Sequence, residues 1–211
     1  MLKAVIVNYN FDPQDWWLDY GYKPEEVLLY DRSDDGIERS FSATVKKTAN
    51  VGNVDYDKLN HLVENYEKLP STFLWIKSNL WKYITPEEYE RVANNKDFTP
   101  LLTQNHRTYS DEKGLVCFYE DGMYHERNQL VYATNLSAKN FNFYADFAKE
   151  FDLPNPDYLP FPPGGNFILT KETVHKHPKE YYAKMASILP YTQLPLEAYF
   201  CERAYFTLWR Q

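Results

Sequence analysis

Three short sets of polar residues follow apolar, β-branched runs of the sequence, and each set could bind part of a nucleotide. The sets are Asn8-Tyr9-Asn10, Asp31-Arg32-Ser33 and Lys77-Ser78-Asn79. A tyrosine ring can stack on a base, a carboxylate can bind ribose hydroxyls, and a lysine or arginine can pair with phosphate. Each set also has an ordinary explanation as a polar turn or cap. Taken alone, each set leaves nucleotide binding and turn formation open.

A fourth set, Asn50-Val51-Gly52-Asn53-Val54-Asp55, leads into an expected helix. Asn, Gly and Asp residues form tight turns and amino-terminal caps, and the helix end that follows can bind an anion. Capping alone explains the same residues. Asp55-Tyr56-Asp57 is a literal Asp-x-Asp sequence. Because it begins the helix, we interpret it as part of the cap.

A fifth set lies in the last quarter of the chain, where Gly164-Gly165-Asn166-Phe167 is followed by Glu197, Glu202 and Arg203. Glu197 is expected in the first turn of the last helix. Glu202 lies five residues later, about 140° further around the helix axis, so the two carboxylates do not share one face. Without catalysis, Glu197 would interact with the helix dipole and Glu202 would pair with a nearby base.

Short strands and a helix alternate in the first third of the chain, and they would bring the first three sets together. Apolar, β-branched composition predicts buried strands at Ala4–Val7, Val27–Tyr30 and Thr72–Ile76. Residues 55–68 have the periodicity of a helix between the second and third strands. This alternation predicts a parallel sheet with right-handed crossovers. Such sheets bind ligands outside the carboxyl ends of their strands, so the three sets would share one edge.

The rest of the chain mixes strands and helices. Thr85-Pro86-Glu87-Glu88 is a capping box that opens a helix, and Asp121-Gly122 predicts a hairpin turn. A helix break is expected before Pro178, and the last helix is expected to begin near Pro195. The other expected elements are strands at Leu115–Tyr119, Leu130–Thr134 and Asn166–Leu169, helices at Phe141–Phe151 and Lys171–Leu189, and loops at Leu153–Pro156 and Pro160–Pro163.

Composition narrows the functional class. The 211 residues are 44% hydrophobic, enough for one buried core, and their net charge of −7 argues against general nucleic-acid binding. Neither a signal peptide nor an apolar stretch of about 20 residues is visible, so we expect no membrane span and a cytoplasmic protein. Two cysteines far apart in the sequence indicate free thiols. With only 7 glycines and neither GxGxxG nor GxxxxGK[ST], a backbone phosphate cradle is not expected.

Aromatic residues make up 18% of the chain, which is an unusually high fraction. Tyrosine and tryptophan combine a flat apolar face with a polar group, and such faces suit the apolar C–H faces of sugar rings. The alternative is that these rings simply fill a core. For any single aromatic residue, we regard core packing as the more frequent outcome.

At these same residues the chain resembles known families. Asn50-Val51-Gly52-Asn53, the segment 59–70, Gly164-Gly165-Asn166-Phe167 and the pair Glu202-Arg203 resemble a family known as a domain of unknown function. The whole chain more closely resembles the N-terminal glycosyltransferase domains of chlorella-virus proteins that glycosylate the major capsid protein. The resemblance implies a single GT-A domain over residues 1–211, with a Rossmann-like mixed sheet, in a longer polypeptide of the host cytoplasm. It also implies a UDP-sugar donor, a glycan or glycoprotein acceptor, and Mn²⁺ or Mg²⁺.

The resemblance also implies roles for individual residues. Lys77, Ser78 and Asn79 stand where GT-A enzymes usually carry Asp-x-Asp, so Asn79 would be a weak ligand and the ion would rest mainly on the donor diphosphate. In an inverting transfer, Glu197 would be the general base, with Asp121 as second choice. The residues expected on the donor side are Asn8, Tyr9, Asn10, Asp31, Arg32, Ser33, Asn53, Lys77, Ser78 and Asn79, and those on the acceptor side are Gly165 and Asn166.

Two other functions compete with glycosyl transfer. A non-catalytic carbohydrate-binding module is consistent with the many aromatic residues and the missing Asp-x-Asp, and it would bind sugar without nucleotide. A nucleotide-sugar hydrolase or pyrophosphorylase is disfavoured, because such enzymes usually carry a glycine-rich phosphate loop or denser carboxylates. Product analysis distinguishes it, since a hydrolase consumes donor without acceptor.

Overall fold

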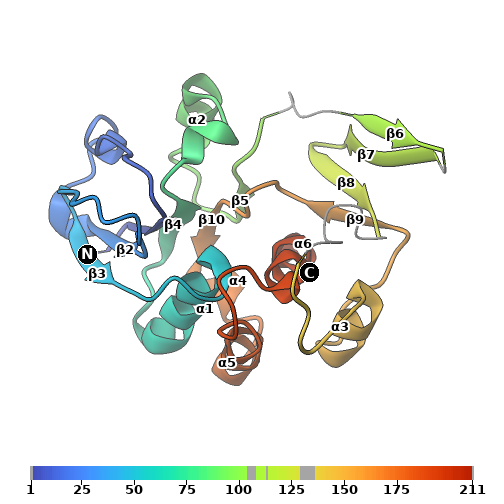
Figure 1. Ribbon diagram of the computed structural model, residues 1–211. Helices are drawn as coiled ribbons and strands as arrows, with labels where there is room; N and C mark the ends of the chain where they lie inside the picture. The colour runs from blue at the N-terminus through green and yellow to red at the C-terminus, as the bar shows by residue number, and fades with distance from the viewer. Residues whose placement is uncertain (1, 104–107, 113, 129–135, 211) are drawn as a thin grey trace.

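The main layer of the protein is a mixed sheet of six strands. The computed structural model describes residues 2–103, 108–112, 114–128 and 136–210. The strands are β1 (Ala4–Asn8), β2 (Val27–Asp31), β3 (Thr44–Lys47), β4 (Thr72–Lys77), β5 (Thr99–Pro100) and β10 (Phe167–Thr170). Their order in the sheet is β3-β2-β1-β4-β10-β5 (Figure 1). Strands β1 to β4 are mutually parallel, whereas β10 runs antiparallel to both β4 and β5.

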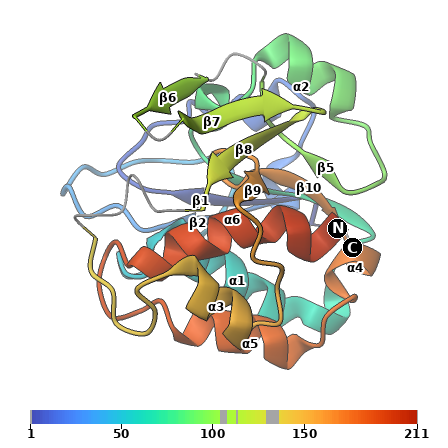
Figure 2. The ribbon, with the colours of Figure 1, turned by 90° about the vertical axis from the view of Figure 1, so that its right-hand side faces the viewer.

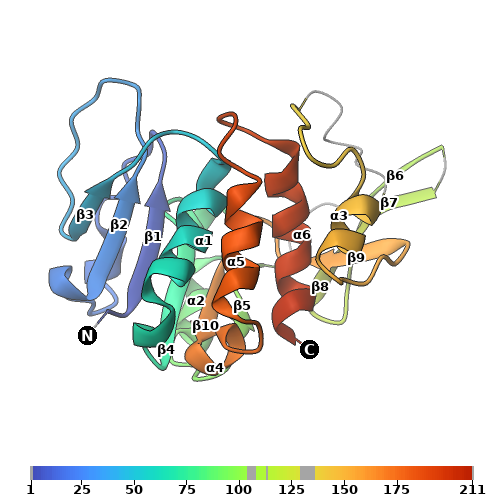
Figure 3. The same ribbon diagram turned by 90° about the horizontal axis from the view of Figure 1, so that it is seen from below.

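Helices cover both faces of this sheet. Helices α1 (Asn53–Asn65), α5 (Lys179–Ser187) and α6 (Leu196–Arg210) lie side by side across one face (Figure 3). The short helix α4 (Lys171–Val174) lies at the end of β10 on the same side, and α2 (Pro86–Val92) lies on the opposite face (Figure 1). All five residues of β1 are buried, and its four apolar residues alternate between the two hydrophobic cores. A strand buried on both faces has a continuous apolar sequence, which is why this strand was visible in the sequence.

A second, antiparallel sheet packs against α6. It contains β6 (Tyr109–Asp111), β7 (Gly114–Glu120), β8 (Met123–Arg127) and β9 (Tyr158–Phe161), in that order. Strand β9 contacts α6, and α3 (Tyr144–Glu150) packs beside the same helix (Figure 2). The predicted hairpin turn joins β7 to β8, because Asp121 and Gly122 both have a left-handed backbone, with φ of 50° and 80°. Two consecutive left-handed residues are what a two-residue hairpin loop requires.

Several sequence predictions are confirmed. The mixed α/β architecture, the strands β1, β2 and β4 and the helix between β2 and β4 are present. The helical region after β10 is interrupted before Pro178, since α4 ends at Val174 and α5 begins at Lys179. Helix α2 has the expected capping box, in which Thr85 Oγ1 accepts a hydrogen bond from the Glu88 amide at 3.3 Å. Cys117 and Cys201 are buried, free thiols. No helix within the described ranges is both long and apolar enough to cross a bilayer.

Other predictions are wrong, and the reasons are physical. The segment expected as a loop at Pro160–Pro163 begins inside strand β9, which pairs with β8 alone among the strands that the structure describes. Proline fits an edge strand, since its missing N–H is not needed on the open side. Strand β3 was not predicted, and all four of its residues are exposed, so it has no buried apolar pattern. The expected strand at residues 130–134 lies outside the described residues.

Burial of His61 makes the stability of the fold depend on pH. The ring is fully buried on α1, and its Nδ1 lies 3.0 Å from the hydroxyl of Tyr30. Burial lowers the pKa of His61 from 6.5 to about 4. Because the folded pKa is the lower one, protonation favours the unfolded chain. The stabilisation is complete above pH 6.5 and is lost as the pH falls from 6.5 toward 4.

We therefore expect the unfolding free energy of the wild type to fall more between pH 7 and pH 4.5 than that of His61→Gln. The expected difference between the two falls is about 2–3 kcal/mol. Other titrating groups, such as Asp57, are common to both proteins and cancel in the comparison. Urea denaturation at the two pH values measures both changes, and equal changes would contradict the assignment.

Candidate functional site

A row of hydrogen-bonded side chains crosses the carboxyl ends of β4, β1 and β2. Ser78 Oγ donates to Asn8 Oδ1 at 2.6 Å, and Asn8 Nδ2 donates to Asp31 Oδ1 at 3.2 Å. Ser33 Oγ also donates to Asp31 Oδ1, at 2.6 Å. The strand order reverses between β1 and β4, and open α/β sheets bind ligands at this type of position. The structure thus brings together four residues that the sequence placed on the donor side, and we call them the strand-end row: Asn8, Asp31, Ser33 and Ser78.

Asp31 is the charged group of the strand-end row. Its carboxylate is buried, and it forms an ion pair with Lys47, whose side chain is 65% exposed. Burial on its own would raise the pKa of Asp31, but the bonds from Lys47, Ser33 and Asn8 outweigh burial and lower it. The group is therefore an anion at neutral pH that accepts hydrogen bonds. Its one exposed partner, Lys47 on β3, was not predicted, because nothing in the sequence pairs β3 with β2.

An exposed tyrosine ring lies beside this row. Tyr9 directly follows β1, is 43% exposed, and accepts a hydrogen bond from Gln193 Nε2 at 2.8 Å. The next residue, Asn10, donates its backbone N–H to Ser33 Oγ at 3.0 Å. The side-chain amide of Asn10 donates to Asp34 Oδ1, also at 3.0 Å. The loops after β1 and β2 are thus tied together, and the exposed Tyr9 ring directly follows Asn8 of the row.

Arg32 and Asn53 were also expected on the donor side, but their side chains bond within the protein near the amino end of α1. The Arg32 side chain is 1% exposed, with Nε 3.6 Å from Asp57 Oδ2. Its Nη2 donates to the backbone oxygen of Val51 at 2.5 Å. Asn53 Oδ1 accepts from the amide of Val54 at 2.7 Å. In this conformation both side chains hold the loop at the amino end of α1, and they do not join the strand-end row.

The two carboxylates of Asp55-Tyr56-Asp57 point to different partners. Asp55 Oδ1 accepts from the Tyr205 hydroxyl at 3.0 Å, whereas Asp57 Oδ2 accepts from Thr48 Oγ1 at 3.2 Å. Burial raises the pKa of both groups, that of Asp57 to about 6. The helix cap itself is Gly52, and no side chain caps it. The interpretation of this Asp-x-Asp as a cap is therefore wrong, and its two carboxylates do not converge on one ion.

A chain of alternating charges runs from β4 through α6 to β8. Lys77 Nζ lies 3.4 Å from Glu202 Oε2, and Glu202 Oε1 lies 3.3 Å from Arg203 Nη1. Arg203 Nε in turn lies 2.7 Å from Glu126 Oε2. Burial alone would raise the pKa of Glu202, but Lys77 and Arg203 outweigh it and lower that pKa. The expected pairing of Glu202 with a nearby base is confirmed. The part played by Glu126 was missed, because 77 residues separate it from Arg203.

The loop before β10 is anchored to the end of β4. Asn166 Oδ1 accepts from the amide of Lys77 at 2.8 Å, and the backbone oxygen of Gly165 accepts from Lys58 Nζ at 2.7 Å. Lys58 is fully buried, and its Nζ lies 4.3 Å from the centre of the Trp75 ring. Burial lowers the pKa of Lys58. The two residues expected on the acceptor side thus lie next to Lys77.

Gly164 and Gly165 give a matched pair of substitutions for this loop. Both have a left-handed backbone, but a Cβ at Gly164 would lie 2.8 Å from ring carbons of Tyr83, whereas at Gly165 the nearest atom is 3.5 Å away. Backbone strain costs about 1–2 kcal/mol in each, and overpacking adds about 1–3 kcal/mol at Gly164 alone. We therefore expect Gly164→Ala to destabilise the fold clearly more than Gly165→Ala. Denaturant unfolding measures both, and equal losses would rule out the close packing of Gly164 on Tyr83.

The two carboxylates expected as general bases lie in other environments. Glu197 is fully buried, and its Oε1 accepts from the amides of Asn140 at 2.7 Å and Lys139 at 3.2 Å. Its Oε2 accepts from the Tyr191 hydroxyl. Burial alone would raise the pKa of Glu197, but these bonds outweigh it and lower that pKa. In this conformation Glu197 holds the segment 139–141. Asp121 lies at the exposed tip of the β7–β8 hairpin.

Residues 77–79, at the end of β4, do not provide the ligand atoms that a divalent ion needs. Lys77 is a cation, and the hydroxyl of Ser78 is bonded to Asn8. Asn79, the predicted weak ligand, offers one neutral amide oxygen, whereas Mn²⁺ and Mg²⁺ prefer carboxylates. Among the residues that the structure describes, no group of three His, Cys, Asp or Glu side chains could hold a metal ion. The residues present therefore do not fit a resident divalent ion at this position.

Comparison with known proteins gives the family of the chain. It belongs to the family described as Protein of unknown function (DUF3431), whose model matches residues 5–211. Neither the comparison with curated proteins nor that with solved structures found a significant match.

Proposed function

We propose that this protein transfers a sugar from a UDP-sugar donor to a glycan or glycoprotein acceptor, with its active site at the carboxyl ends of β1, β2 and β4. The observation that carries the proposal is the strand-end row, which joins a buried, charged Asp31 at the end of β2 to Asn8 and Ser78 at the ends of β1 and β4, the two strands between which the strand order reverses. The GT-A fold type, the role in capsid glycan synthesis and the cytoplasmic location are part of the same proposal, and they rest on the sequence resemblance.

The donor nucleoside would bind between Tyr9 and Asp31. The exposed Tyr9 ring offers a surface on which uracil can stack. The ribose hydroxyls would donate to Asp31, taking the place of the exposed Lys47 ammonium. A carboxylate at the end of the second strand has the same function in other nucleotide-binding sheets. Asn8, Ser33 and Ser78 would keep this carboxylate in position.

Lys77 would stabilise the leaving diphosphate. Its side chain is 15% exposed and belongs to the last residue of β4, where the pyrophosphate would extend from a ribose on Asp31. As the glycosidic bond to the donor breaks, negative charge develops on the diphosphate, and a preorganised cation lowers the barrier. An Mn²⁺ or Mg²⁺ ion would be held mainly by the donor diphosphate and not by protein side chains.

The general base of the transfer stays a prediction, with Glu197 and Asp121 as its candidates. Glu197→Gln replaces one of two carboxylate oxygens that accept hydrogen bonds within the fold by an NH2 group, so its effect on activity must be read beside its effect on stability. Asp121→Asn changes an exposed turn residue and leaves the core intact. A fall in kcat with an unchanged unfolding midpoint would identify the base.

Acceptor-dependent release of UDP tests the proposal. The protein is incubated with UDP-glucose, UDP-galactose, UDP-N-acetylglucosamine or UDP-xylose, each with and without a mixture of neutral oligosaccharide acceptors. We expect UDP release with at least one donor, dependent on acceptor and abolished in Asp31→Asn. Equal release without acceptor would indicate a hydrolase. Sugar binding without any UDP binding would indicate the non-catalytic carbohydrate-binding module.

A further inference from the structure

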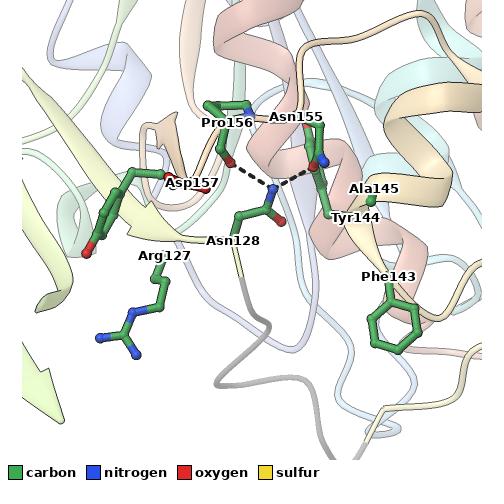
Figure 4. Close-up of a pocket in the computed structure, with 9 residues that line it drawn as sticks. Arg127, Asn128, Phe143, Tyr144, Ala145, Asn155, Pro156 and Asp157 are labelled. Atoms are coloured by element: carbon green, nitrogen blue, oxygen red, sulfur yellow. Dashed lines mark hydrogen bonds between the residues drawn. The ribbon is translucent and has the colours of Figure 1, made fainter. Parts of the chain in front are cut away.

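A second candidate site is a cavity between the amino end of α3 and the strands β8 and β9 of the second sheet. The cavity has a volume of about 610 Å³, which is within the range of pockets that hold small ligands. Figure 4 shows Asn128 in the middle of its wall, with Arg127 and Phe143 on opposite sides. The other lining residues come from α3 and from the segment that leads into β9: Tyr144, Ala145, Asn155, Pro156, Asp157 and Tyr158.

The single cationic side chain among these lining residues is already neutralised. Arg127 forms a bidentate ion pair with Asp111, with N–O distances of 2.9 and 3.0 Å. It also donates to the backbone oxygens of Gly114 and Leu115, both at 2.7 Å. Asp157 adds a carboxylate to the lining. A pocket whose arginine is already paired, and which also carries an acidic group, favours a neutral ligand over phosphates, carboxylates and other anions.

The remaining side chains combine amide groups with one exposed ring. Asn128 Nδ2 donates to Asn155 Oδ1 at 2.7 Å and to the backbone oxygen of Pro156 at 2.9 Å. These bonds use both amide hydrogens of Asn128, and in Figure 4 its carbonyl oxygen points to the side on which Phe143 lies. Because Asn155 uses its side-chain oxygen to accept from Asn128, its own amide hydrogens are the groups it can offer to a ligand. Phe143 is 65% exposed, the highest exposure among the large hydrophobic residues described.

We propose that this pocket binds a neutral saccharide. The exposed ring of Phe143 would cover the apolar C–H face of a pyranose. The side-chain oxygens of Asn128 and Asp157 would accept hydrogen bonds from the sugar hydroxyls, and the Asn155 amide would donate to them. Saccharide binding at this pocket stands on its own observations. The identification of the ligand as part of the acceptor glycan rests on the proposed function.

Saturation-transfer difference NMR tests the proposal without any nucleotide. The probes are maltose, cellobiose and lactose, with glucuronic acid and glucose 6-phosphate as charged counterparts. The proteins are the wild type, Phe143→Ala, Phe143→Trp, Asn155→Ala and the control Ile37→Ala, which removes an exposed apolar side chain outside the pocket. Both residues to be changed in the pocket are exposed, so the unfolding midpoints should stay within about 2 °C of the wild type.

We expect at least one neutral disaccharide to give a signal with the wild type, and neither charged sugar to do so. The signal should fall at least fivefold in Phe143→Ala and in Asn155→Ala, and should be retained in Phe143→Trp and Ile37→Ala. Absence of a signal with all three disaccharides would overturn the proposal. An unchanged signal in both Phe143→Ala and Asn155→Ala would also overturn it.

The same variants separate this inference from the proposed function. Phe143→Ala should bind UDP as the wild type does, because the pocket shares no residue with the strand-end row. Asp31→Asn should lose UDP binding and keep the disaccharide signal. A wild-type protein that binds UDP but none of the disaccharides would therefore contradict only the saccharide site, and one that binds a disaccharide but no UDP would contradict only the donor site.

Discussion

Replacing Lys77 by methionine is expected to lower kcat for sugar transfer by about 10²–10³-fold, the usual cost of removing one preorganised charge-stabilising group. Its ammonium stands at the end of β4, where the donor diphosphate would develop charge, and methionine keeps most of the length and apolar volume of the side chain. Lys77→Arg is the matched control, because it retains the cation and should lose much less activity. Initial rates of UDP release with a saturating donor measure the effect.

The loss must be distinguished from a folding defect, since Lys77 also pairs with Glu202. Glu202 keeps Arg203 as a partner in the variant, so the fold should survive with a moderately lowered unfolding midpoint. A roughly threefold loss of activity corresponds to less than 1 kcal/mol of activation free energy. If Lys77→Met lost no more than this, Lys77 would not stabilise the leaving diphosphate.

The largest effect on stability is expected from Arg203→Leu. Arg203 joins Glu202 on its own helix to Glu126 on β8, and all three side chains are less than 15% exposed. Removing the cation leaves the buried carboxylate of Glu126 without its ion-pair partner, whereas Glu202 keeps Lys77, and an unpaired buried charge typically costs about 3–5 kcal/mol. For a chain of this size, the unfolding midpoint should fall by roughly 10 °C.

The matched control is Lys46→Met, which breaks the ion pair of Lys46 with Glu64, where both side chains are about half exposed. Exposed pairs contribute less than about 1 kcal/mol, so this variant should unfold close to the wild type. Adding Glu126→Leu to Arg203→Leu should recover part of the lost stability, because it removes the carboxylate that lost its partner. Equal midpoints for Arg203→Leu and Lys46→Met would show that the buried charge chain does not stabilise the fold.

The central strands were predictable because burial on both faces of the sheet gives them a continuous apolar sequence. In β1 and β4 almost every residue lies in one of the two cores, so short apolar runs identify them. Edge strands carry no such signal. All residues of β3 are exposed, and β9 contains a proline that resembles a loop residue in the sequence.

Sequence alone could predict those residues of the candidate site that lie at the ends of the central strands. Asn8, Asp31 and Ser78 each follow or end an apolar strand, and parallel pairing alone places them at one edge. Ion-pair partners of Asp31 and Arg203 come from strands whose position the sequence did not reveal. Lys47 reaches Asp31 through the unpredicted β3, and Glu126 reaches Arg203 from another sheet. Glu197 was placed correctly in the first turn of its helix, but its bonds to residues 139 and 140 depend on a loop path that no local pattern encodes.

Binding of UDP to the strand-end row is the most direct test of the account. The unfolding midpoint is measured for the wild type and Asp31→Asn with UDP, with ADP, and with neither, each in the presence and absence of Mn²⁺. At a hundred times its Kd a ligand adds about 2.7 kcal/mol, so UDP should raise the wild-type midpoint by roughly 5–10 °C. ADP should not, and Asp31→Asn should lose the effect of UDP. No shift with UDP, or the same shift in Asp31→Asn, would contradict a donor site at the carboxyl ends of β1, β2 and β4.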